Sequence, residues 1–178
     1  DPVRRLVIGN VINLVQWVRL IPTADLDEKV AGPLGGGERA RQKGAPYGMR
    51  RGVLMSPLGV PCNPPPWGTL TAINLDTGER RWQVPFGRVP LVAGMLGPAE
   101  WGSPNLGGPL VTAGGLIFIG ASMDARIRAI NAWTGQTLWQ HDLPFDGVAT
   151  PMTFVSKTDG MQYVVLAAGG SSLLRKPL

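Results

Sequence analysis

The stretch Ala-Ile-Asn-Leu-Asp-Thr-Gly-Glu-Arg-Arg-Trp at residues 72–82 recurs 57 positions later as Ala-Ile-Asn-Ala-Trp-Thr-Gly-Gln-Thr-Leu-Trp at residues 129–139. Six of the eleven positions are identical, and a glutamine follows both closing tryptophans. A fixed spacing of this size is typical of supersecondary units that stack along a chain. The repeat therefore outweighs any local evidence for a single helix or strand.

Each copy of the repeat predicts a β-hairpin. Apolar and polar residues alternate before the turn, which indicates a strand. Gly78 or Gly135 then supplies the positive φ that a tight hairpin needs. The second strand ends in Trp82 or Trp139, whose ring can cover a neighbouring sheet while its indole N–H donates to a carbonyl. We expect an all-β chain of antiparallel sheets, docked through these tryptophans into part of a β-propeller.

The composition agrees with a turn-rich β domain. The 178 residues include 25 glycines and 17 prolines, and 44% of the chain is hydrophobic, which is too much for a disordered chain. The single cysteine, Cys62, allows no internal disulfide and no metal cluster, and we expect a structural thiol.

The net charge of +5 would suit a nucleic-acid partner or an anionic membrane. The basic residues form one local cluster in a glycine- and proline-rich loop: Arg39, Arg41, Lys43, Arg50 and Arg51. Because no nucleic-acid module or interleaved aromatic residue accompanies this cluster, we predict a basic surface and no nucleic-acid partner.

Residues 101–123 are uncharged and could suggest a membrane span. They hold six glycines and two prolines, and they divide into two short strands around residues 113–115. A spanning helix needs about 20 predominantly apolar residues without such interruptions, so we expect none here.

The expected organisation follows the repeat along the chain. Strands at residues 3–8 and 11–21 are predicted to form a hairpin around Gly9-Asn10, and a helical turn is considered for residues 24–31. The predicted segments are the end of an upstream blade at 1–22, long loops at 23–67, tryptophan-motif blades at 68–108 and 109–143, the start of a final blade at 144–170, and an atypical tail at 171–178.

Several motifs extend beyond the tryptophan repeat. The most specific are Asn-Leu-Gly-Gly-Pro at 105–109 and Thr-Ala-Gly-Gly-Leu-Ile-Phe-Ile-Gly-Ala at 112–121; others are Arg-Leu-Ile-Pro at 19–22, Tyr-Gly at 47–48, Ser-Pro-Leu-Gly-Val-Pro-Cys at 56–62, Trp-Gly at 67–68, Ala-Thr-Pro-Met-Thr at 149–153 and Gln-Tyr-Val-Val at 162–165. In these motifs the chain resembles the C-terminal blades of membrane-bound quinoprotein dehydrogenases, the family of glucose and quinate/shikimate dehydrogenases that depends on pyrroloquinoline quinone (PQQ).

The resemblance implies a fold, a cofactor and a reaction. The family folds as an eight-bladed propeller with PQQ and Ca²⁺ on its axis. It oxidises a sugar, polyol or cyclic hydroxy acid at the periplasmic face of the inner membrane and passes electrons to ubiquinone. A planar tricarboxylate such as PQQ needs stacking surfaces, basic partners and a hard cation with oxygen ligands. The quinone performs the oxidation, while the protein supplies orientation and a base.

The resemblance also suggests two cofactor-binding residues. Asp124 matches an aspartate associated with the cofactor pocket, although an Asx-type turn residue is the alternative. Asn105 would lie on a cofactor-side loop, or else cap a turn before Gly107. The lone histidine, His141, matches no family role and is expected at the surface. Catalytic and Ca²⁺-binding residues are expected in other blades, so we predict no catalytic or metal residue in this chain.

The chain departs from the family pattern at Ser171, where the resemblance implies a histidine beside the substrate. The expected closing strand is also missing. These departures predict a fragment or truncated product that is inactive alone and whose partners are the missing blades, a small sugar or polyol, and ubiquinone. Two alternatives stay open: a non-catalytic PQQ-like propeller scaffold, and a decayed remnant whose unpaired sheet edges would favour aggregation.

Overall fold

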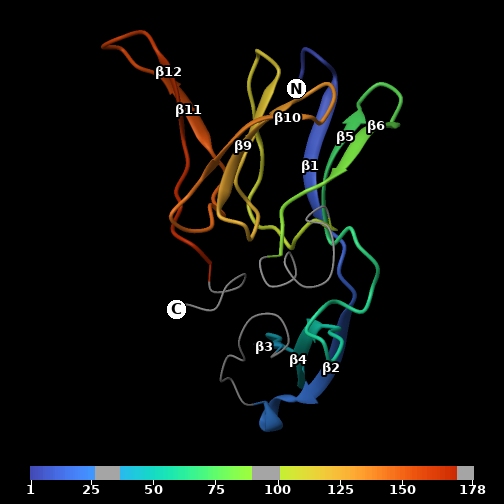
Figure 1. Ribbon diagram of the computed structural model, residues 1–178. Helices are drawn as coiled ribbons and strands as arrows, with labels where there is room; N and C mark the ends of the chain where they lie inside the picture. The colour runs from blue at the N-terminus through green and yellow to red at the C-terminus, as the bar shows by residue number, and fades with distance from the viewer. Residues whose placement is uncertain (27–36, 90–100, 172–178) are drawn as a thin grey trace. The chain divides into compact units, whose positions relative to one another are not determined.

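The computed structural model describes residues 1–26, 37–89 and 101–171 (Figure 1). Within these residues the chain is built from β-strands, with a 3₁₀ turn at Thr23–Asp25. It divides into two compact units. Of the described residues, the first unit comprises 1–13, 65–89 and 101–170, and the second comprises 14–26, 37–64 and 171.

The first unit contains three antiparallel sheets. Sheet 1 has the order β1-β5-β6, sheet 2 the order β10-β9-β8-β7, and sheet 3 pairs β11 with β12. The strands are β1 (Leu6–Ile12), β5 (Gly68–Asn74), β6 (Arg80–Pro85), β7 (Leu110–Val111), β8 (Leu116–Ile119), β9 (Arg126–Asn131), β10 (Thr137–Asp142), β11 (Met152–Val155) and β12 (Gln162–Val165). The two copies of the repeat are thus the β5–β6 and β9–β10 hairpins of neighbouring sheets.

The second unit is one sheet with the order β2-β4-β3. Its strands are β2 (Gln16–Pro22), β3 (Glu38–Arg41) and β4 (Tyr47–Val53). The ring of Trp17 lies directly over Gly52, where a Cβ atom would come within 2.9 Å of it. This glycine therefore allows the indole to lie flat on the strand.

The predicted hairpin around Gly9-Asn10 is wrong. The strand β1 runs straight through both residues, which pair with Thr71 and Leu70 of β5. A distant strand supplies the backbone hydrogen bonds that a local turn would otherwise have made. The segment predicted as loops at 23–67 likewise contains β3 and β4. Of the helical turn considered for residues 24–31, residues 27–31 lie outside the described residues.

The main hydrophobic core contains residues of sheets 1 and 2 and of the loops that follow their strands. Seven buried residues form it: Leu70, Phe86, Ile117, Ile119, Ala121, Ile130 and Ala132. Trp82 and Val84 of β6 pack against this cluster. Because full burial of a leucine or isoleucine side chain contributes about 1.5–3 kcal/mol, this core stabilises the packing of the two sheets.

Three hairpin turns share one hydrogen-bonding scheme, although only two belong to the sequence repeat. In the turns that begin at Asn74, Asn131 and Ser156, the first residue's N–H donates to the carbonyl five residues on. A glycine N–H four residues on donates back to the first residue's carbonyl. The Asn or Ser side-chain oxygen also accepts backbone N–H groups inside the turn. This explains why asparagine and glycine are kept in both repeat copies.

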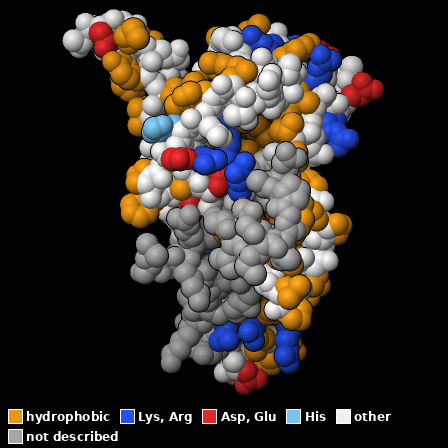
Figure 2. Space-filling model, in the orientation of Figure 1, with side chains coloured by type: hydrophobic (Ala, Val, Ile, Leu, Met, Phe, Trp, Pro, Cys, Tyr) orange, Lys and Arg blue, Asp and Glu red, His pale blue; other side chains and the backbone are white. Residues whose placement is uncertain are grey.

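Sheet 3 carries the third of these turns and exposes an apolar surface. Six large hydrophobic side chains of its strands and turn are between 43% and 64% exposed: Met152, Phe154, Val155, Met161, Tyr163 and Val165. Figure 2 shows orange side chains along this hairpin. The Tyr163 hydroxyl donates to Asp159 at 2.7 Å, which lowers the pKa of Asp159 and raises that of Tyr163.

Candidate functional site

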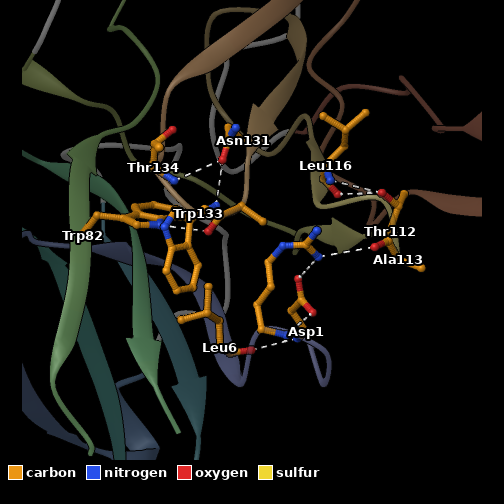
Figure 3. Close-up of polar contacts among 11 residues, drawn as sticks. Asp1, Leu6, Trp82, Thr112, Ala113, Leu116, Asn131, Trp133 and Thr134 are labelled. Atoms are coloured by element: carbon orange, nitrogen blue, oxygen red, sulfur yellow. Dashed lines mark hydrogen bonds and ion pairs between the residues drawn. The ribbon is translucent and has the colours of Figure 1, made fainter.

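The two sheets of the repeat dock through Trp82. Its indole Nε1–H donates to the Ala132 carbonyl at 3.0 Å, in the turn of the next hairpin (Figure 3). The ring also lies over Gly135 of the same turn, where a Cβ atom would come within 2.7 Å of the ring. Gly135 is therefore required for two reasons, its φ of +76° and the indole above it.

The other turn glycine and the other tryptophan of the repeat, Gly78 and Trp139, have different surroundings. Gly78 has a φ of +72°, yet a Cβ atom there would meet nothing within 4 Å. Trp139 is 50% exposed and stacks parallel to His141, with ring centroids 6.0 Å apart. We find no hydrogen bond from its indole N–H within the described residues. In this part of the chain Trp139 thus makes no contact like that of Trp82 with a neighbouring hairpin.

A second connection between the sheets involves the first residues of the chain. Arg4 bonds the Asp1 carboxylate at 2.9 Å and the Ala113 carbonyl at 3.3 Å, so it links the segment before β1 to the β7–β8 turn (Figure 3). The Arg4 guanidinium lies against Gly115 of that turn. This contact was not predicted from the sequence, because nothing in the local pattern relates these two segments.

Asn105 is buried, and its side chain makes three hydrogen bonds within the described residues. Its Oδ1 accepts from Asn10 Nδ2 at 2.6 Å. Its Nδ2 donates to the carbonyls of Val11 at 3.3 Å and Ser103 at 3.2 Å. The side chain thus ties β1 to the loop that leads into sheet 2. The sequence analysis missed Asn10, because it assigned that residue to a turn.

Asp124 is also buried, in an ion pair with Arg128. The Asp124 and Arg128 side chains are 7% and 9% exposed. One carboxylate oxygen accepts from Ser122 Oγ at 2.6 Å and Arg128 Nη1 at 3.2 Å, and the other pairs with Arg128 Nη2. The guanidinium carbon of Arg128 lies 5.4 Å from the centre of the Phe86 ring. Arg128 was missed in the sequence, although a charged residue on a core-facing strand position needs a partner nearby.

The structure brings Asn105 and Asp124 to neighbouring positions. Asn105 pairs through its backbone with Ser122, whose hydroxyl bonds the Asp124 carboxylate. The loop around Ser122 is strained, because Ala121 and Ala125 have φ values of 55° and 49°. Such conformations cost about 1–3 kcal/mol each and persist only where the surroundings impose them. The buried ion pair and the Asn105 hydrogen bonds provide that constraint.

A pocket of about 230 Å³ lies beside this network. Its walls include Phe86 and Arg88 from the segment that follows β6, and the cross-strand pair of Arg128 on β9 and Gln140 on β10. Asp146, which no sequence motif singled out, is 1% exposed and accepts the Gly170 N–H at its backbone carbonyl.

We tested these residues against the needs of a tricarboxylate quinone and a calcium ion. The polar atoms of Asp124 and Asn105 are already bound by protein groups. Among the described residues, no three His, Cys, Asp or Glu side chains gather where they could hold a metal ion. In the described part of the chain, these two side chains are therefore held by protein groups. None of the helices in the described part of the chain could cross a membrane.

Comparison with known proteins gives the family. Residues 1–164 match the family model described as PQQ, glucose/ethanol/alcohol dehydrogenase, β-propeller domain. The chain belongs to this PQQ β-propeller dehydrogenase family. The resemblance inferred from the motifs is confirmed, as is the fold class of a partial β-propeller with antiparallel sheets.

The chain is similar to several quinoproteins. A probable quinate dehydrogenase (quinone) from Xanthomonas campestris pv. juglandis is 42% identical, over 96% of this chain and 23% of the relative. The quinoprotein glucose dehydrogenase of Escherichia coli strain K12 is 39% identical, over 96% of this chain and 22% of the relative. The crystal structure of quinohemoprotein alcohol dehydrogenase from Comamonas testosteroni matches with a TM-score of 0.58 and 27% identity, over 95% of this chain and 21% of that one. The chain thus spans less than a quarter of the length of these relatives.

The Trp82 contact predicts different costs for the same substitution at two glycines. Alanine at Gly78 or Gly135 must adopt a positive φ, at about 1–2 kcal/mol. Only at Gly135 would the added methyl group also collide with the Trp82 ring, which adds about 1–3 kcal/mol for overpacking. In urea unfolding, Gly135→Ala should therefore lose more stability than Gly78→Ala. The difference should disappear in a Trp82→Ala background, and its persistence there would contradict this account.

The buried ion pair predicts strong coupling between Asp124 and Arg128. Arg128→Met leaves a buried carboxylate without its cation and should cost about 3–5 kcal/mol. The double variant Asp124→Leu with Arg128→Met should cost much less than the sum of the single variants. A double-mutant cycle from urea unfolding measures this coupling. Additive losses would show that the pair does not act as a unit.

Proposed function

We propose that this chain is part of a PQQ-dependent dehydrogenase that oxidises a hydroxyl group of a sugar, polyol or cyclic hydroxy acid. The observation that carries this proposal is the identity of about two residues in five to quinate and glucose quinoproteins, along 96% of the chain. A glycerol dehydrogenase large subunit from Gluconobacter thailandicus is 41% identical over 89% of the chain. The proposed substrate class therefore includes sugars, polyols and cyclic hydroxy acids. Ca²⁺ beside PQQ, ubiquinone as acceptor and a place at the periplasmic face of the inner membrane belong to the same proposal.

Within such an enzyme, this chain's own residues would shape the scaffold around the reaction. Bound PQQ supplies the two-electron oxidant. Asp124 and Asn105 would act by holding the loops at one end of sheet 2 in a fixed conformation. The Asp124–Arg128 ion pair supports this role. Its two opposite charges cancel, and Arg128 also donates a hydrogen bond to Ser122, within the loop that holds the strained residues Ala121 and Ala125. We assign no catalytic or metal-binding residue in this chain, and we propose that it needs the remaining blades for activity.

One observation favours a second candidate, a non-catalytic propeller scaffold or interaction module. Asp124 and Asn105, the two residues predicted to bind the cofactor, bond to protein groups in the structure. A scaffold would need these bonds for stability alone. The two candidates therefore differ in whether this segment supports cofactor binding in a complete propeller.

A segment exchange tests the proposal. Residues 1–170 replace the matching segment of Escherichia coli quinoprotein glucose dehydrogenase, the unaltered enzyme being the control. The chimera should bind PQQ in the presence of Ca²⁺ and reduce ubiquinone with glucose, because the segment provides equivalent blades. The isolated chain should bind PQQ weakly or not at all in a calorimetric titration. A chimera that folds normally, judged by circular dichroism, but neither binds PQQ nor oxidises glucose would favour the scaffold.

A further inference from the structure

The pocket of about 230 Å³ lies within the interface that sheets 1 and 2 make with each other. Val84 and Phe86 belong to β6 and the segment that follows it, whereas Ile130 and Thr137 are a cross-strand pair of sheet 2. Every lining residue lies in the first unit, on a strand of these two sheets or directly after one. The pocket is therefore formed by this chain's own packing.

The pocket carries hydrogen-bond donors and basic groups. Four polar side chains are among its lining residues: Arg88, Arg128, Thr137 and Gln140. Arg128 and Gln140 lie directly opposite each other on β9 and β10. Because side chains two positions apart on a strand share a face, Arg128 points to the same side of sheet 2 as the core residue Ile130. None of the described lining residues is acidic.

The Arg128 guanidinium uses only part of its hydrogen-bonding capacity. Its five N–H groups form a rigid planar fork. Asp124 accepts from Nη1 and Nη2, and Ser122 accepts from Nη1. The Nε–H and the second Nη2–H make no hydrogen bond with any described residue. These two groups lie side by side along one edge of the fork, and such an edge binds two oxygens of one carboxylate or phosphate.

This edge of Arg128 is fixed in position and yet accessible. The side chain is 9% exposed, Asp124 binds its other edge, and the guanidinium carbon lies 5.4 Å from the centre of the Phe86 ring. The Nε atom is nevertheless not one of the fully buried polar atoms that lack a partner, so it is within reach of the pocket that Arg128 lines. A group that is held in place before a ligand arrives loses little entropy on binding.

The charges near the pocket favour an anion. Arg128 is balanced by Asp124, and the Arg126 and Asp142 side chains, one pair further from Ile130, join at 2.7 Å. Arg88 is exposed and makes no ion pair with any described residue. Three arginines thus accompany two carboxylates, which leaves one positive charge for a ligand to balance.

The size of the pocket favours a small ion. Its volume of about 230 Å³ is below the ~300 Å³ at which pockets for drug-sized ligands usually begin. Thr137 and Gln140 add a hydroxyl and an amide, both of which donate hydrogen bonds to oxygen. A compact group with several oxygen acceptors therefore suits this pocket better than a large or apolar molecule.

We propose that the pocket between sheets 1 and 2 binds a small oxyanion, a carboxylate or a phosphate. Two of its oxygens accept from the Nε–H and the second Nη2–H of Arg128, and Arg88 supplies the balancing charge. The Asp124 carboxylate holds the opposite edge of the guanidinium. The site belongs to the interface between two sheets of this chain and does not rest on the proposed function.

An NMR titration of the isotope-labelled 178-residue chain tests the proposal. Sodium phosphate and sodium acetate are added separately, and sodium chloride keeps the ionic strength constant, because salt screens exposed charges. The Nε–H resonance of Arg128 should shift and saturate with at least one of the two anions, as should the amides of Gly87 and Gln140. The anion that saturates the shift at the lower concentration identifies the source as a phosphate or a carboxylate.

Two variants and one control identify the site. Arg88→Gln removes an exposed charge and should raise the dissociation constant by about fivefold. Arg80→Gln is the matched control, because Arg80 is also exposed but donates to Gln83 at 2.9 Å and is not a lining residue. It should bind as the unaltered chain does. Arg128→Lys keeps the charge but lacks the two-pronged edge, and it should abolish saturation.

Circular dichroism checks that each variant remains folded. If Arg128→Lys does not fold, the comparison of Arg88→Gln with Arg80→Gln decides the question, because both change an exposed side chain.

Three results would overturn the proposal. Shifts that grow in proportion to the anion concentration without saturating would mean adventitious contacts only. Equal weakening by Arg88→Gln and Arg80→Gln would mean that the anion responds to the overall charge. Saturable shifts elsewhere with no movement of the Arg128 Nε–H would place the anion on another basic surface, such as the cluster that contains Arg41 and Lys43.

Discussion

The fold of the first unit depends on one interaction, the Trp82 ring laid on the turn of the next hairpin. The ring excludes water from the edge of the core, and its N–H satisfies the Ala132 carbonyl. This single contact explains why three positions need the residue types that they have. Gly135 must lack a side chain beneath the ring, Asn131 must hold the turn in shape, and Trp82 must stand at the outer strand of its sheet. This constraint explains why the asparagine, the glycine and the tryptophan are identical in the two copies of the sequence repeat.

The loops at one end of sheet 2 show how a propeller can hold an irregular segment in place. Two non-glycine residues with positive φ, Ala121 and Ala125, flank a segment of buried polar side chains. The cost of these conformations is offset by the ion pair of Asp124 with Arg128 and by the hydrogen bonds of Ser122. A loop held in this way is rigid enough to border a reaction centre, which agrees with the proposed place of the chain in a quinoprotein dehydrogenase.

Sequence reasoning succeeded where the determining contacts are local or repeated. The hairpins, the positive φ of both turn glycines and the docking of Trp82 follow from residues within eleven positions of each other and from the repeat. It failed where distant segments decide the structure. Gly9 and Asn10 look like a turn, but pairing with β5 keeps them extended. The partners of Asn105 come from β1 and from its own loop, and Arg128 becomes the partner of Asp124 only once the strand directs it into the core. The last hairpin, with its turn at Ser156 to Gly160, was also predicted, although serine and aspartate there replace the asparagine and threonine of the repeat.

Hydrogen exchange in a Trp82→Ala variant tests the central claim most directly. If the Trp82 contact holds sheets 1 and 2 together, the amides of Leu70 on β5 and Ile117 on β8 should lose protection together and by a similar factor. The Trp82→Phe variant should lose less protection, because it keeps a ring over Gly135 and lacks only the hydrogen bond. Unchanged protection of both strands in Trp82→Ala would contradict the account.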